Sequence, residues 1–190
     1  SVDLLGDAYV VNRAFGAQGS ITKFASSIAR CEDRDGSGAI RTSRDDDGNG
    51  SISFDELLPW GSDECVIWNQ PVGLFDAWPR AIAIGSGDGE SPQGYVWAGT
   101  FFRGGGVGDG TVVRLSAVTG ERVGDVISLP ADYHPYGAVV DCRGLLWLHS
   151  GGNLIAIDTR TGRIVTGPSA PDGRINTVAG ADGCRSGYGI

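Results

Sequence analysis

The chain lacks several features that mark whole classes of protein. Its 190 residues contain no apolar run near the roughly 18 residues of a membrane-spanning helix, so we expect no membrane span. There is no C-x-x-C pair and there are only two histidines, which excludes the usual zinc spacings. The chain also has no excess of basic residues: 15 Lys and Arg stand against 23 Asp and Glu. We therefore expect no nucleic-acid partner.

Glycine is the residue present in excess, with 32 copies in the chain. Such a content disfavours long helices, because glycine is a poor helix former. Apolar residues alternate with polar ones in short runs between glycine-rich turns, as they do in half-buried strands. The sequence therefore predicts an all-β fold of antiparallel meanders.

A repeat organises these strands. Three segments carry an aromatic residue three positions after a glycine: 6–11, 94–99 and 144–149. Another strand is expected after each (19–24, 110–115, 152–157), and one before the second and third (80–85, 136–141). Four strands in about 40–50 residues are typical of a propeller blade. We expect one domain, residues 1–190, of about three four-stranded antiparallel blades, with the aromatic residues filling the core between sheets.

The two ends of the chain match each other in this repeat. Tyr188-Gly189-Ile190 followed by Ser1-Val2-Asp3 reproduces the pattern of the strand at 136–141. We therefore expect a terminal blade shared between the chain ends. Three interpretations stay open: a piece of a longer propeller, chains that join through open sheet edges, or a boundary that falls inside a strand.

Four cysteines suggest disulfide bonds. Cys31 and Cys65 bracket an acidic segment, and Cys142 and Cys184 lie in the last third, so we expect pairs 31–65 and 142–184 among the three possible connectivities. Disulfides imply an oxidising compartment, hence a secreted, periplasmic or cell-surface protein. Four buried thiols in a cytosolic protein are the alternative.

The segment 31–65 is predicted to be a calcium-binding insertion in the first blade. Residues 31–64 hold ten acidic residues against three arginines. The run 45–56 fits an EF-hand loop at every position, with glycine at position 6 and an acid at position 12. The expected Ca²⁺ ligands are Asp45, Asp47, Asn49, the Ser51 carbonyl, Ser53 and Glu56. A solvated acidic loop is the alternative.

A second loop, 33–44, is a weaker candidate. Asp33, Asp35 and Ser37 occupy ligand positions, but position 12 is Arg44, which cannot bind a cation. This loop either binds weakly, borrows a carboxylate such as that of Asp46, or no longer binds. Neither loop has flanking helices, so we expect the ion to stiffen a disulfide-closed loop rather than to open a helix pair.

The repeat motifs resemble those of a known group. Tyr-Gly-x-x-Val-Asp at 136–141, Gly-x-x-Trp at 144–147 and Ile-Asp-x-x-Thr-Gly at 157–162 are similar to the virginiamycin B lyase-like and NHL-like propeller repeats of bacteria. The segment 31–68 looks like an insert of large secreted bacterial propeller proteins. The resemblance implies a propeller fold, and a lyase of this type would need a histidine base, for which only His134 and His149 are present.

We therefore expect an extracellular, calcium-stabilised structural or adhesive protein that self-associates through its incomplete terminal blade. One alternative is a module of a larger secreted propeller that binds a glycan or a surface protein, through loops such as 101–106. A second alternative is a virginiamycin B lyase-like enzyme. No catalytic residue set is assigned, because no triad or paired-carboxylate spacing accompanies the two histidines.

Overall fold

The computed structural model describes residues 1–89, 91–102, 110–166 and 171–176, and these form three antiparallel sheets. The first sheet has the order β1 (Ala8–Asn12), β2 (Ser20–Phe24) and β3 (Val66–Pro71). Between β2 and β3 lie two short 3₁₀ helices, η1 (Ile28–Arg30) and η2 (Phe54–Glu56). None of the described helices is long and apolar enough to cross a membrane.

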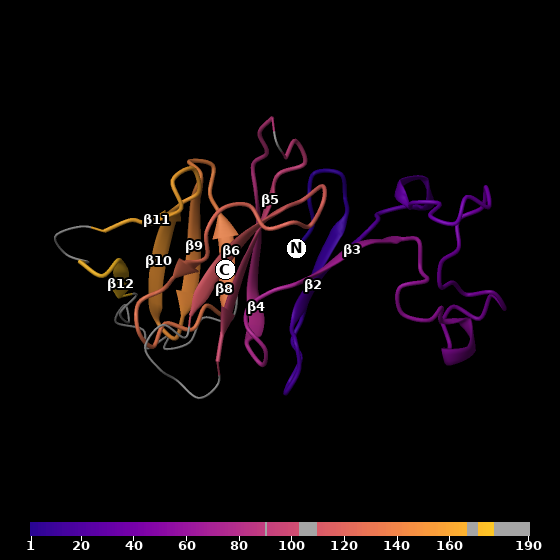
Figure 1. Cartoon of the computed structure of the whole chain (residues 1–190), viewed down its shortest axis with the longest axis horizontal. Coiled ribbons are helices and arrows are strands. Elements are labelled where there is room, and N and C mark those ends of the chain that lie inside the picture. Colours follow the sequence, from indigo (N-terminus) through magenta and orange to yellow (C-terminus); the bar gives the residue numbers. More distant parts are fainter. Residues whose placement is uncertain (90, 103–109, 167–170, 177–190) are drawn as a thin grey trace.

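The other two sheets follow along the chain as meanders (Figure 1). The second contains β4 (Trp78–Gly85), β5 (Tyr95–Phe101), β6 (Thr111–Ser116) and β7 (Ile127–Ser128). The third contains β8 (Gly137–Val140), β9 (Leu145–Ser150) and β10 (Asn153–Asp158). Two short strands, β11 (Arg163–Ile164) and β12 (Arg174–Asn176), pair with different parts of β10 and together form the outer edge of the third sheet.

The predicted all-β meanders are confirmed, whereas the propeller is not. Every strand expected from the repeat is present in the antiparallel order. Ser1 and Tyr9 exchange backbone hydrogen bonds, and Val2 forms an isolated β-bridge with Ala8, so the start of the chain pairs with the first sheet at one point. The described residues form no closed ring of sheets. Residues 188–190, which are expected to share a strand with residues 1–3, lie outside the described residues.

The three sheets pack face to face, and the middle one is covered on both sides. Every residue of β5 is buried. Because side chains alternate along a strand, Val96 and Ala98 of β5 contribute to the core shared with the first sheet. Tyr95 and Trp97 contribute to the core shared with the third. The repeat aromatic residues thus fill the space between sheets, as expected.

An aspartate turn opens the first and third units in the same way. Asp3 accepts hydrogen bonds from the backbone N–H groups of Leu5 and Asp7, and its second oxygen accepts the Tyr9 hydroxyl at 2.8 Å. Asp141 repeats this pattern with two backbone N–H groups and the Trp147 indole N–H at 3.1 Å. The pKa of Asp141 lies well below its usual range, mainly because of the Leu145 N–H. These conspicuous aspartates therefore serve the fold.

One of the two expected disulfides is observed. Cys31 and Cys65 are bonded, which confirms the bracket around the acidic segment. Cys142 is exposed and forms no disulfide with another described cysteine. Its expected partner, Cys184, lies outside the described residues, so this second pairing stays a prediction.

Candidate metal centre

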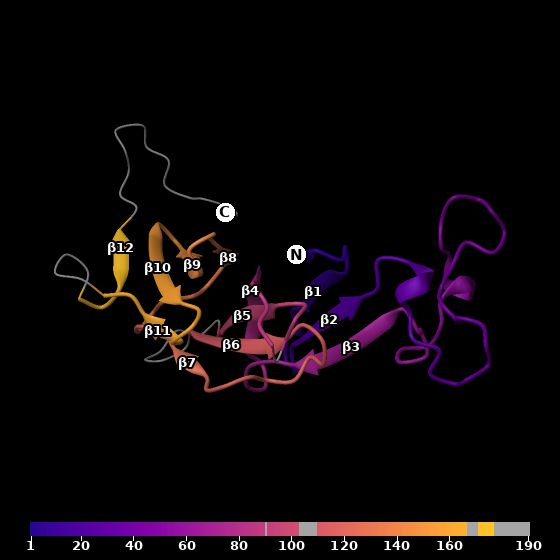
Figure 2. The same cartoon turned by 90° about the horizontal axis from the view of Figure 1, so that it is seen from above.

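The acidic segment 31–65 projects away from the three sheets, as Figures 1 and 2 both show. Its ends meet at the disulfide, where the Cα atoms of Cys31 and Cys65 are 4.4 Å apart. Backbone bonds from Ala25 to Cys65 and from Glu32 to Glu64 continue the β2–β3 pairing to this point. The insertion is therefore a closed loop on a rigid base.

A buried ion-pair cluster fixes this base to the first sheet. Asp7 accepts two hydrogen bonds from the Arg30 guanidinium, at 2.6 and 2.8 Å, just before the disulfide. The Lys23 ammonium lies 3.3 Å from the Asp7 carboxylate and 3.9 Å from that of Asp3. The Arg30 guanidinium, above all, holds the pKa of Asp7 well below its usual range. Asp7 therefore joins the sheet to the insertion as a buried anion between two cations.

The loop 45–56 brings three expected ligands together. One carboxylate oxygen from each of Asp45, Asp47 and Glu56 lies within 4.8 Å of the others. Backbone N–H groups orient the first two: Asn49 donates to both, and Gly50 donates to Asp45. Gly50 has φ +87°, a conformation that an L side chain rarely adopts. The three acids that the sequence pattern selects therefore lie close together, and their role as ligands stays a prediction.

Glu56 closes this loop through its backbone. One oxygen accepts the N–H groups of Asp46 and Asp47, and the other accepts the N–H and the hydroxyl of Ser53. These bonds favour the ionised form, with Ser53 the largest contributor, and lower the pKa of Glu56 to about 2. The Ser53 hydroxyl therefore bonds Glu56, and the Asn49 oxygen accepts the Ser51 N–H. The roles of the Ser51 carbonyl and the Ser53 oxygen as ligands stay predictions, because the carboxylate group is defined by acidic side chains alone.

The loop 33–44 is built in the same way, except that its closing acid comes from outside the twelve residues of the loop. Ser37 N–H donates to Asp33 and Asp35, and Gly38 N–H donates to Asp33, as Asn49 and Gly50 do in the other loop. Its closing acid is Glu64: one oxygen accepts the N–H groups of Arg34 and Asp35, and the other accepts that of Arg41. Each of these bonds occupies the loop position of a bond that Glu56 makes. Asp33, Asp35 and Glu64 form a second carboxylate group within 4.8 Å.

Sequence reasoning missed Glu64 because it lies outside the twelve-residue window. The carboxylate that the sequence suggests for this loop, that of Asp46, instead accepts a hydrogen bond from Arg44 at 2.5 Å. A signal was nevertheless present, since Glu64 precedes Cys65 and the expected disulfide brings that position next to Cys31 and Asp33. Glu64 is also the one buried residue of the insertion. The loop 33–44 therefore has a closing carboxylate, that of Glu64, although its own position 12 is Arg44.

The two carboxylate groups are suited to a hard divalent cation. Backbone N–H groups lower the pKa values of Asp45, mainly through Gly50, and of Glu64, mainly through Arg41. The pKa of Asp35 is lowered chiefly by Ser37. These bonds favour the ionised forms of Asp35, Asp45 and Glu64. Carboxylate oxygens bind Ca²⁺ or Mg²⁺ in preference to softer metals. Each of the two carboxylate groups could therefore hold a metal ion.

The positions considered for other functions lie elsewhere. The His134 ring stacks on Phe101 with ring centroids 5.1 Å apart, and its backbone N–H donates to Ser150. His149 lies on β9 and is buried. Of the loop 101–106, residues 103–106 lie outside the described residues. Among the described residues, neither histidine belongs to a group that could hold a metal ion.

Comparison with known proteins does not identify a family. Neither the family models nor the curated proteins contain a match to this chain. The resemblance to propeller repeats therefore stays a prediction from the motifs. The geometry of the two carboxylate groups and of the sheets is the basis for inferring a function.

Proposed function

We propose that this chain is an extracellular structural protein in which Ca²⁺ stabilises a disulfide-closed insertion on a propeller-type β-repeat scaffold, and in which the scaffold self-associates. The observation that carries the proposal is the duplicated carboxylate group. Two loops of one insertion use the same backbone bonds to orient two aspartates and one glutamate. A solvated acidic surface has no need of such repetition.

Calcium is the expected ion because of the ligand chemistry and the loop pattern. Asp45, Asp47 and Glu56 would hold one ion, and Asp33, Asp35 and Glu64 a second. Asn49, Ser37 and a loop carbonyl supply further oxygens by their positions in the pattern. Because Glu56 and Glu64 bind backbone N–H groups on both sides of their loops, an ion on these acids would tie each loop together. Binding and ordering of the insertion are therefore linked.

Isothermal titration of the full chain with CaCl₂ tests this assignment. We expect two sites in the parent chain, loss of one in Glu56→Gln and loss of the other in Glu64→Gln. Asp55→Asn is the matched control, because Asp55 accepts a hydrogen bond from Ser53 and lies outside both carboxylate groups. Unchanged binding in both glutamate variants would overturn the proposed sites.

Self-association is proposed from the outer faces of the first and third sheets. The middle sheet is covered on both faces, whereas the first and third sheets each pack against it with one face. On the third sheet, Leu146 and Leu148 face the middle sheet, so Trp147 and its cross-strand partner Val139 lie on the other face. Val10 lies on the outer face of the first sheet and is 45% exposed. These faces would complete one another as further blades.

Light scattering on the full chain in CaCl₂ tests self-association. We expect assemblies larger than the monomer that shift toward monomer in Val139→Asp. Val118→Asp is the matched control, because Val118 has the same 37% exposure as Val139 but lies in the turn after β6. A parent chain that remains monomeric at all concentrations would overturn this part of the proposal.

A further inference from the structure

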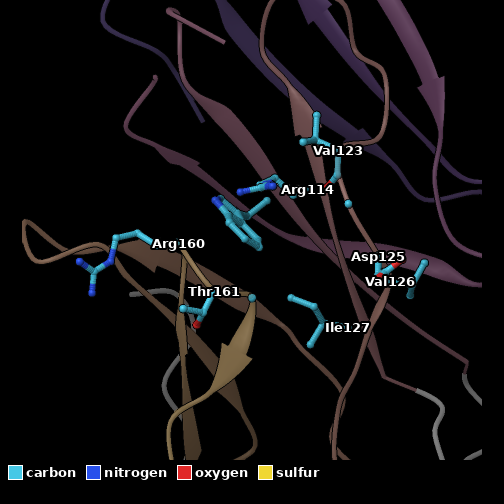
Figure 3. A pocket seen from close by; sticks show the side chains of 10 residues that line it. Arg114, Val123, Asp125, Val126, Ile127, Arg160 and Thr161 are labelled. Carbon is cyan, nitrogen blue, oxygen red and sulfur yellow. Dashed lines mark hydrogen bonds between the residues drawn. The ribbon is translucent and has the colours of Figure 1, made fainter. Parts of the chain in front are cut away.

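A groove runs between the second and third sheets, away from the insertion. It consists of two adjoining cavities of about 380 and 450 Å³ that share Trp97, Arg114 and Arg160 in their walls. Figure 3 shows Arg114 reaching into the first cavity, with Asp125 and Ile127 on one side and Thr161 on the other. The size of each cavity is within the range of sites for small molecules.

Arg114 is the chemically notable residue of this groove. It projects from β6 opposite Trp97, with its guanidinium 4.6 Å from the ring centroid of Tyr95. Its hydrogen bonds go to two carbonyl oxygens, of Thr159 at 3.4 Å and Val123 at 3.5 Å, both at the limit of a useful bond. Among the described residues, no carboxylate lies within ion-pair distance of it. Asp88 lines the second cavity, but its carboxylate accepts the Tyr95 hydroxyl and is not paired with Arg114. Within the described part of the chain, Arg114 is therefore a half-buried cation that forms no ion pair.

The first unit of the repeat has a cation at the position of Arg114, and there the charge of the cation is neutralised. Lys23 of β2 pairs with Tyr9 as Arg114 pairs with Trp97. Its ammonium is buried against Asp7 and Asp3 and donates to Gln93 at 2.7 Å. Counting from the turn glycine, the residues that correspond to Asp3 and Asp7 in the second unit are Ser91 and Tyr95.

The two units therefore treat one cation differently. In the first, internal carboxylates neutralise the cation and its ammonium is buried. In the second, uncharged residues replace both carboxylates and the cation lines a groove open to solvent. Holding a charge partly away from water without a counter-charge is costly, and an external anion removes that cost.

We propose that this groove is an anion-binding site that takes the carboxylate of an acidic sugar. A planar guanidinium matches a carboxylate in a two-bond arrangement, and Arg114 is held in place by Tyr95. Arg143 and Arg160 at the rim pair with their sequence neighbours Asp141 and Asp158 and are largely exposed, so both can turn toward a ligand.

The remaining wall explains the choice of a sugar over a bare ion. Away from Arg114, the Asp125 carboxylate can accept a hydrogen bond from a ligand hydroxyl, and the Thr161 hydroxyl can donate or accept one. A ligand with one carboxylate and several hydroxyls uses both parts of the groove. This proposal is independent of calcium, since no residue of the insertion lines either cavity.

Titration of the full chain with sodium glucuronate, followed by NMR and by tryptophan fluorescence, tests the proposal. We expect saturable shifts at the Trp97 indole, at least tenfold weaker binding of glucose, and weakening as salt is added. Arg114→Gln should reduce affinity at least tenfold, and Arg114→Lys should reduce it by less. Arg122→Gln is the matched control, because Arg122 lies on the neighbouring segment and lines neither cavity.

Several outcomes would overturn the site. Equal binding of glucose and glucuronate would contradict a role for charge, and tighter binding of glucose 6-phosphate would contradict the carboxylate class. Unchanged affinity in Arg114→Gln would remove Arg114 from the site. A thermal melt of each variant shows whether it is folded, and the Arg114→Lys variant keeps the test valid should Arg114→Gln unfold. Repetition in EDTA separates this result from the calcium proposal.

Discussion

The sheets and the insertion are held together by opposite means. The sheets share two continuous apolar cores, in which residues such as Ile155 and Val96 are fully buried. The insertion buries a single residue between its cysteines, Glu64, and exposes Phe54 and Trp60. Its order comes from a disulfide and from carboxylates that accept backbone N–H groups. Apolar packing therefore specifies one region and hydrogen-bonded charge the other, within the same chain.

The largest effect is expected where the two regions meet, at Asp7. Asp7→Asn removes the carboxylate that Lys23 and Arg30 share and leaves Lys23 with Asp3 alone, at 3.9 Å; breaking a buried ion pair from one side costs about 3–5 kcal/mol. Thermal unfolding should show a lower midpoint for the sheets, and limited proteolysis should show cleavage near η1. A variant with parent stability would show that the sheet does not need the base of the insertion.

Removing the disulfide should affect the insertion more than the cores. Cys31→Ser with Cys65→Ser opens a loop whose bonded residues are 34 positions apart, and such bonds stabilise by about 2–4 kcal/mol. We expect hydrogen exchange to accelerate in residues 32–64 while the core of β5 and β9 stays protected. Equal acceleration in both regions would contradict the division between them.

A smaller effect is expected inside the sheets at Tyr9. Tyr9→Phe keeps the ring in the core but removes the hydroxyl that bonds Asp3, at a cost of about 1 kcal/mol. Chemical denaturation measures this difference. Ca²⁺ binding in this variant should equal that of the parent chain, because Tyr9 belongs to the sheet; altered binding would show that the two regions are coupled through this residue.

The smallest effect is expected at Glu56 when the pH is lowered, and the part of the acid response that comes from this residue lies in the insertion. The pKa of Glu56 is lowered from its ordinary value of 4.5 to about 2, so its contribution to stability is complete well above pH 4.5. That contribution is lost as pH falls from 4.5 through 2, because the unfolded loop takes up the proton first. NMR of the Asp46 and Asp47 amides should follow this titration in the metal-free chain, and Glu56→Gln should remove it.

The sequence predicts the strands well and the charged contacts poorly. Alternating residues and turn glycines such as Gly120 and Gly162 mark each meander, because these signals are local. The charge of Lys23 predicts a side chain in solvent, yet Lys23 lies on the same face of β2 as Ile21 and is buried, because Asp3 and Asp7 from the segment before β1 neutralise it. Glu64 escapes the motif for the same reason: its role depends on a disulfide that brings distant residues together.

The short distance across the base of the insertion has a practical consequence. With Cys31 and Cys65 4.4 Å apart, the segment between them leaves and re-enters the scaffold at nearly one point. Such a site accepts transplantation: a foreign loop with closely spaced ends fits between β2 and β3 without altering their register. For the same reason, the segment 31–65 can be grafted onto another β-hairpin.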